Sequence, residues 1–164
     1  MFFHAMRAAV LVAATALVAL AGEQHASLQG VETGHFVTNT GPQPGTVITN
    51  DFAEGIAPRL GKYTLVAREE IDGQTGKITG GAFVITAADG GTILGTYDGT
   101  ASLQPTSVSW IANGAIAGGT GRFAGATGTI HIEGFSNTET SCQGLADLVV
   151  CGFTETTSME LVLP

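Results

Sequence analysis

Apolar and polar residues alternate with a period of two through much of this chain, which is typical of β-strands with one buried face. The clearest case is residues 61–72, where one face carries Tyr63, Leu65, Ala67, Glu69 and Ile71. Residues 77–88 contain an apolar run centred on Val84, and a turn beginning at Asp72 joins them to the first segment. The two segments are therefore predicted to form a hairpin.

Five further strands are predicted from runs rich in β-forming residues between turn residues: 92–100, 107–117, 129–135, 147–153 and 158–163. The pattern is weak in residues 22–60, where only residues 46–49 look like a strand, so we treat residues 61–164 as the body of the domain. No helical period follows residue 21. The chain is predicted to be a single all-β domain, an antiparallel meander that closes into a barrel or folds into a sandwich.

A glycine-rich run at residues 117–128 separates two of these strands. Its closely spaced glycines suit a sharp β corner with an apolar anchor, and the residues expected to shape it are Gly119, Gly121, Phe123, Gly125 and Gly128. A nucleotide-binding loop is the alternative. That reading lacks the spacing of the dinucleotide fingerprint, a following helix and the lysine of a phosphate-binding loop.

The first 21 residues have the pattern of a secretory signal peptide. Basic Arg7 precedes a continuous apolar run over residues 8–20, and small residues at Ala19 and Ala21 fit a cleavage site. The run is too short to span a bilayer comfortably. We expect a secreted or periplasmic protein with no membrane anchor after cleavage; a buried N-terminal helix is the alternative.

Charge excludes two classes of partner. The chain has six Lys and Arg against 14 Asp and Glu, a net charge of −8. Nucleic acids and anionic membranes both select clustered basic residues, so neither is expected to bind.

Cys142 and Cys151 are the only cysteines. In an exported chain an even pair predicts a disulfide. They are too few to ligate zinc without nearby histidines and lack the Cys-x-x-Cys redox spacing, so no metal and no cofactor are expected.

The glycine-rich run resembles the Gly-Gly-x-Gly-x-Phe corner of allene oxide cyclases and dirigent proteins. A Gly-Thr-Tyr-x-Gly strand at residues 95–99 precedes it and an apolar strand at 129–132 follows, as in that superfamily. The resemblance covers roughly residues 60–135. It implies a calycin-like, eight-stranded antiparallel barrel in an exported bacterial relative, with an apolar interior and often a homo-oligomeric state. The Pro-Phe-Thr-Asn element of the cyclases does not match residues 50–55, so the activity does not carry over.

If the barrel interior is a pocket, apolar and aromatic residues should line it with few polar groups. Glu69 is the candidate catalytic acid or base, because burial among apolar neighbours would raise the pKa of its carboxyl. Solvation at a strand end is its alternative. The candidate ligand-binding residues are Tyr63, Phe83, Tyr97 and Trp110, for which plain core packing is the alternative.

Outside the interior, His131 and Glu133 share a strand face and are expected to point outward, whereas Arg122 should pair with carbonyls or an acid in the corner. Three functions follow: a barrel that binds a small apolar ligand in its lumen, a cyclase or isomerase without cofactor, or an interaction protein that uses an exposed sheet face. The enzyme would need Glu69, Asp98, His131 or another titratable group in the lumen.

Overall fold

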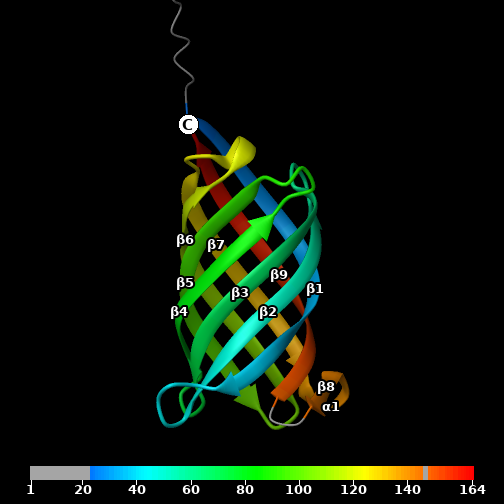
Figure 1. Cartoon of the computed structure of the whole chain (residues 1–164). Helices are drawn as coiled ribbons and strands as arrows, with labels where there is room; N and C mark the ends of the chain where they lie inside the picture. The colour runs from blue at the N-terminus through cyan, green and yellow to red at the C-terminus, as the bar shows by residue number, and fades with distance from the viewer. Residues whose placement is uncertain (1–22, 146–147) are drawn as a thin grey trace, which may run out of the picture.

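The computed structural model describes residues 23–145 and 148–164 and shows a closed antiparallel barrel (Figure 1). The predicted signal peptide at residues 1–21 lies outside these residues. The strands are β1 (Gln24–Thr40), β2 (Thr46–Ala57), β3 (Gly61–Asp72), β4 (Lys77–Thr86), β5 (Thr92–Gln104), β6 (Ser107–Gly119), β7 (Thr127–Asn137), β8 (Cys142–Leu145) and β9 (Leu148–Leu163).

Eight of these strands form the barrel wall in the order β1 to β7 and then β9, and the pairing of β1 with β9 closes it. The short strand β8 pairs with one end of β9. Closure leaves the wall without a free edge and divides the side chains strictly into inward and outward sets. The all-β barrel predicted from the sequence is confirmed.

Two predicted elements differ from the structure. β1 is a 17-residue strand in the segment where the sequence indicates only residues 46–49, and β9 is one continuous strand where two were predicted. Both strands place polar or very small residues at inward positions, including Gly30, Glu32 and Glu155, which disrupts the alternation. A four-residue helix α1 (Thr138–Ser141), capped by the Asn137 side chain, was also not predicted.

The two ends of the barrel are built differently. The glycine-rich corner lies at the end where the chain finishes, and α1 and β8 lie at the other (Figure 1). At the corner end the interior is filled by buried side chains, which include Leu60, Ile93, Phe123 and Leu161. At the α1 end lie the hairpin turns that join β1 to β2, β3 to β4 and β5 to β6.

The disulfide predicted between Cys142 and Cys151 is present. The two residues are directly paired across β8 and β9, so the bond fixes the short strand and α1 to the wall. On the chain-entropy model a loop of this length stabilises the fold by roughly 2–3 kcal/mol. No helix in the described part of the chain is long and apolar enough to cross a membrane.

The strand–turn–strand corner is confirmed, with a single 3-10 turn at Gly121–Phe123 between β6 and β7. The ring of Phe123 is buried, and Arg122 pairs with Asp89 at 3.1 Å and donates to the carbonyl of Arg59. Gly121 and Gly125 have φ angles of +61° and +75°, which L side chains rarely adopt. These two glycines let the corner fold over the end of the barrel.

Gly121→Val is expected to lower the free energy of unfolding by about 1–3 kcal/mol, because a β-branched residue is strained at this φ. Its added Cβ would also lie 3.2 Å from the Cα of Gly91. Urea unfolding measures the change. Gly144→Val is the control, since no atom lies within 4 Å of its added Cβ, and it should stay within about 0.5 kcal/mol of the wild type. Equal stability of the two variants would contradict this role of the corner.

Candidate functional site

Four acidic side chains face the inside of the barrel: Glu32 on β1, Asp51 on β2, Glu69 on β3 and Glu155 on β9. All Lys and Arg residues of the described ranges are exposed, so none of them neutralises this set. A buried carboxyl without a cation must be protonated or hydrogen-bonded. The interior therefore holds a group of acids whose charge the protein itself does not balance.

Two of the acids face each other across the strands that close the barrel. Glu32 and Glu155 are direct partners in the β1–β9 register. The Tyr63 hydroxyl donates to Glu32, and the indole N–H of Trp110 donates to Glu155 Oε2 at 3.0 Å. Burial raises the pKa of Glu32. Burial and the nearby Glu32 raise the pKa of Glu155 to about 8, so Glu155 is largely protonated at neutral pH.

The other two acids form a hydrogen-bonded pair. Burial and the neighbouring carboxyl of Glu69 raise the pKa of Asp51 well above its usual range, and Asp51 donates to Glu69. Glu69 also accepts the Tyr97 hydroxyl at 2.6 Å. Burial raises the pKa of Glu69 as well, although both hydrogen bonds oppose this effect. Two carboxyls this close resist ionising together, because the charge of one disfavours the charge of the other.

A β-bulge positions Glu69. The register shifts between Arg68 and Glu70 on β3, where two residues of β4, Gly80 and Gly81, lie opposite Glu69 alone. Gly80 has a φ of +62°, and its N–H donates to Asp98 Oδ1 at 3.1 Å. A bulge of this kind turns a side chain toward a different direction from its neighbours.

Glycines on neighbouring strands make room for the large inward side chains. A Cβ at each of these glycines would collide with the aromatic ring of its cross-strand partner, and the pairs are Gly55 with Tyr63, Gly81 with Tyr97, Gly95 with Phe83 and Gly134 with Trp110. The rings therefore lie flat across the wall. This packing holds the hydroxyls and the indole N–H at fixed places inside the barrel.

A cavity of about 210 Å³ opens at the α1 end, and we call it the cup. Its walls are mainly apolar, with Phe36, Val47, Ile71, Ile78, Leu103, Val108 and Trp110 among them. The polar side chains that line it are Thr38, Thr49, Asp51 and Glu69. Beyond Asp51 and Glu69 lies a space of about 20 Å³ that also touches Tyr97 and Glu155, large enough for one water molecule. The acid pair therefore lies between the cup and the deeper interior.

Thr49 adds a third oxygen beside the pair. It is the direct cross-strand partner of Glu69 and lies two residues before Asp51 on the same face of β2. Thr49 is only 3% exposed, and its hydroxyl has no hydrogen-bond partner among the described residues. Buried hydroxyls are normally paired, so this one is available to a molecule in the cup.

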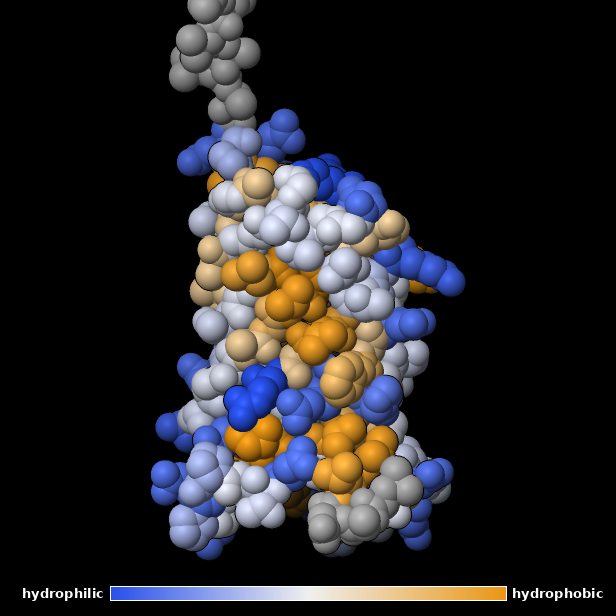
Figure 2. Space-filling view, viewed as in Figure 1, coloured by the Kyte–Doolittle hydropathy of each residue, from blue (hydrophilic) through white to orange (hydrophobic). Residues whose placement is uncertain are grey.

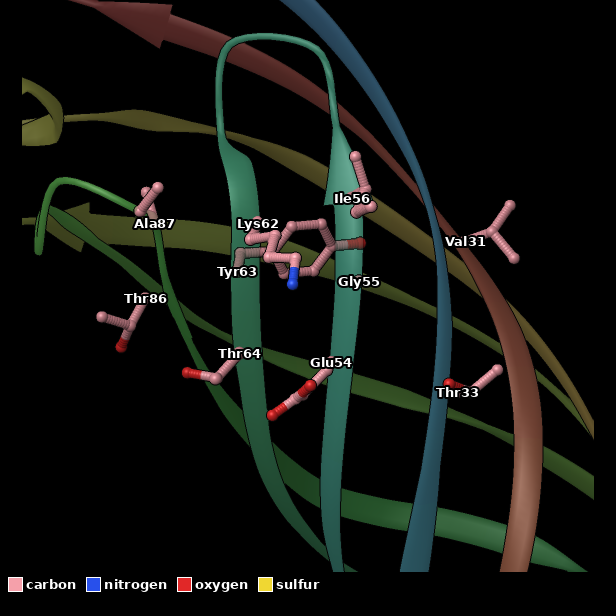
Figure 3. A pocket seen from close by; sticks show the side chains of 11 residues that line it. Val31, Thr33, Glu54, Gly55, Ile56, Lys62, Tyr63, Thr64, Thr86 and Ala87 are labelled. Atoms are coloured by element: carbon pink, nitrogen blue, oxygen red, sulfur yellow. The ribbon is translucent and has the colours of Figure 1, made fainter.

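A larger but shallower groove of about 670 Å³ lies on the outer face near the corner end (Figure 3). The exposed side chains of Val31, Glu54, Ile56 and Lys62 line it. Because solvent reaches these side chains freely, the groove is a poorer pocket for a small molecule than the cup.

Between this groove and the α1 end, a row of apolar side chains crosses four strands on the outside of the barrel, and we call it the outer row. Phe52, Val66, Val84 and Leu94 are consecutive cross-strand partners on β2, β3, β4 and β5, and each is between 39% and 47% exposed. Figure 2 shows this outer row as a diagonal hydrophobic band on the face formed by these strands.

The structure gathers several of the candidate residues inside the barrel. Glu69, Tyr97 and Trp110 lie around the floor of the cup, whereas Tyr63 and Phe83 are buried in the interior without lining it. The roles predicted for these residues stay predictions. As expected, His131 and Glu133 lie on the outer face, 3.0 Å apart.

Sequence reasoning missed Glu32, Thr49, Asp51 and Glu155. Their inward positions follow from the strand register. The sequence offered one signal for them, which is that each lies an even number of residues from apolar residues of the same strand. In the described ranges, no three His, Cys, Asp or Glu side chains are arranged to hold a metal ion.

No protein-family model and no curated protein matches this chain. Among solved structures the chain is similar to the pterocarpan synthase dirigent protein GePTS1, with 17% identity over 87% of this chain and 86% of that chain and a TM-score of 0.27. Both values are too low to support a shared activity. The barrel described above rests on the strands of this chain, and the resemblance of residues 117–128 to a superfamily stays a prediction.

The raised pKa of Glu155 predicts how stability depends on pH. Glu155 is protonated in the folded state up to a pKa of about 8, whereas it ionises near 4.5 when exposed. Unfolding therefore releases a proton between these values, and the free energy of unfolding should fall as pH rises from 5 to 8, by up to about 1.4 kcal/mol per pH unit.

Urea unfolding at several pH values measures this slope, and Glu155→Gln should reduce it. Glu54→Gln, which removes an exposed acid of β2 outside both salt bridges of the described residues, is the control and should leave the slope unchanged. A Glu155→Gln protein with the wild-type slope would show that Glu155 is ionised inside the folded barrel.

Proposed function

We propose that this protein is an exported barrel that binds a small, largely apolar molecule in the cup. The observation that carries the proposal is the cup itself, with an apolar wall and with polar groups gathered near one acid pair. Ligand sites commonly combine apolar walls, which supply affinity, with a few polar groups that fix orientation. A barrel with a fully packed interior would have no such site.

The volume of the cup limits the size of its ligand. A cavity of about 150 Å³ holds a benzene molecule. The cup, at about 210 Å³, therefore suits one aromatic ring with a short substituent, or an aliphatic molecule of similar size. The indole of Trp110 and the ring of Phe36, which meet edge to face with centroids 6.3 Å apart, offer an aromatic wall.

Two observations support export. Residues 1–21 have the composition of a signal peptide, and the disulfide between Cys142 and Cys151 is typical of an oxidising compartment.

Filling the cup tests the proposal. Ala101 is buried in its wall, so Ala101→Phe should occupy the space and weaken the binding of 2-phenylethanol at least about tenfold, as measured by calorimetry or NMR titration. Ala115→Phe places the same ring at an exposed position of β6 and is the control. Equal binding by both variants would locate the ligand elsewhere, and no binding by the wild type would remove the support for the cup.

Native mass spectrometry of protein from its own source identifies the natural ligand.

A cyclase or isomerase is a second candidate, and the buried hydrogen-bonded pair of Asp51 and Glu69 supports it. A carboxyl pair with raised pKa values can give and accept a proton near neutral pH. In that case Glu69→Gln would abolish turnover of the natural ligand and leave its binding intact. Asp98 and His131 face outward and do not contribute.

The outer row supports a third candidate, a contact surface for a second copy of this chain. The four row residues are apolar and uncharged, so two copies with a net charge of −8 could meet there without bringing row charges together. Val66→Lys with Val84→Lys should convert an oligomer into monomers in sedimentation experiments. The control changes Ala115 and Thr129, exposed partners on β6 and β7, to lysine. A monomeric wild-type protein would contradict this use of the row.

A further inference from the structure

The acids around the cup identify the chemical class of its ligand more closely. We infer that the cup takes a small apolar molecule that carries an ammonium group, and that Thr49, Asp51 and Glu69 bind this group. The inference rests on the proposed function, because it concerns the same cavity.

The number and position of the oxygens fit an ammonium. A primary ammonium has three N–H donors and no acceptor. Thr49 and Glu69 are cross-strand partners, and Asp51 is the next inward residue of β2, so three acceptor groups lie on adjacent positions of the cup. The Thr49 hydroxyl is buried and has no hydrogen-bond partner among the described residues, so it is free to accept from the ligand.

The charges around the cup also favour a cationic ligand. The side chains that face the pair from other strands are Tyr97 and Glu155, with Glu32 and Tyr63 further away. None of these groups can carry a positive charge. The basic side chains of the described residues are on the outside. When the pair loses a proton, an anionic ligand is repelled and a neutral ligand leaves the new charge unbalanced. A cation is the ligand that neutralises it.

The walls of the cup fit the rest of such a molecule. Trp110 lines the same two cavities as Asp51 and Glu69, so an ammonium held by the acids shares its space with an indole, which attracts cations. The apolar residues above accept the hydrocarbon part. Binding would favour ionisation of both acids, so a proton is released to solvent as the ammonium enters.

The test compares three probes of similar shape: 2-phenylethylamine, 2-phenylethanol and 3-phenylpropionate. At pH 8 the amine should bind at least about tenfold more tightly than the alcohol, since hydrogen bonds between charged groups are stronger than neutral ones. The preference should shrink toward pH 5 as the acids become protonated. Calorimetry in buffers of different ionisation enthalpy should show proton release for the amine alone.

Variants separate this inference from general binding. Asp51→Asn and Glu69→Gln should each bring the ratio of amine to alcohol affinity close to one, and a cooperative urea transition checks that each variant is folded. Glu70→Gln removes the next acid of β3, which does not line the cup, and should behave as wild type.

An alcohol or carboxylate that binds as tightly as the amine at pH 8 would overturn the ammonium inference and leave the ligand-binding proposal standing. The same holds if Asp51→Asn and Glu69→Gln retain the amine preference. Failure of all three probes to bind would overturn both.

Discussion

Removal of carboxyl groups from water is the constraint on which the interior of this barrel depends. Pairing of β1 with β9 closes the wall and leaves Glu32 and Glu155 directly opposite each other. A charge that cannot reach water is costly unless a proton, a hydrogen bond or an opposite charge compensates it. The protein supplies the first two through protonation and through Tyr63, Tyr97 and Trp110. The described residues include no cation inside the barrel, and a positively charged ligand would supply one.

The fold and the site are linked through the same residues. The aromatic side chains that bond the acids need glycines on the facing strands, and the bulge at Gly80 sets the position of Glu69. An apolar core would stabilise a barrel of this size with less cost, because buried acids weaken the fold wherever they must ionise. Acids retained in such an interior are therefore candidates for function rather than stability.

Much of the barrel could be predicted from the sequence, because the strands from residue 61 to residue 135 alternate cleanly. The corner at residues 117–128 was predictable from glycine spacing, and Glu69 from its place among apolar residues. β1 and the middle of β9 were not, since Glu32, Glu155 and Thr157 occupy inward positions where an apolar residue would reveal a strand. The polar residues that form the site also interrupt the apolar pattern by which their strands would be recognised in the sequence. Asp51 and Thr49 were missed for a related reason: only the β2–β3 register brings them beside Glu69.

The interior carboxyls should hold protons at higher pH than exposed acids do, and Glu155 should stay largely protonated in the folded protein at neutral pH. Carbon-13 NMR of protein labelled at the side-chain carboxyls measures each pKa directly, and Asp51→Asn, Glu69→Gln and Glu155→Gln assign the signals. The Glu155 signal should titrate near pH 8, and the signals of Asp51 and Glu69 should titrate above the range of exposed acids. If every carboxyl titrated at the value of an exposed acid, about 4 to 4.5, the interior would be hydrated and its acids would carry no raised pKa.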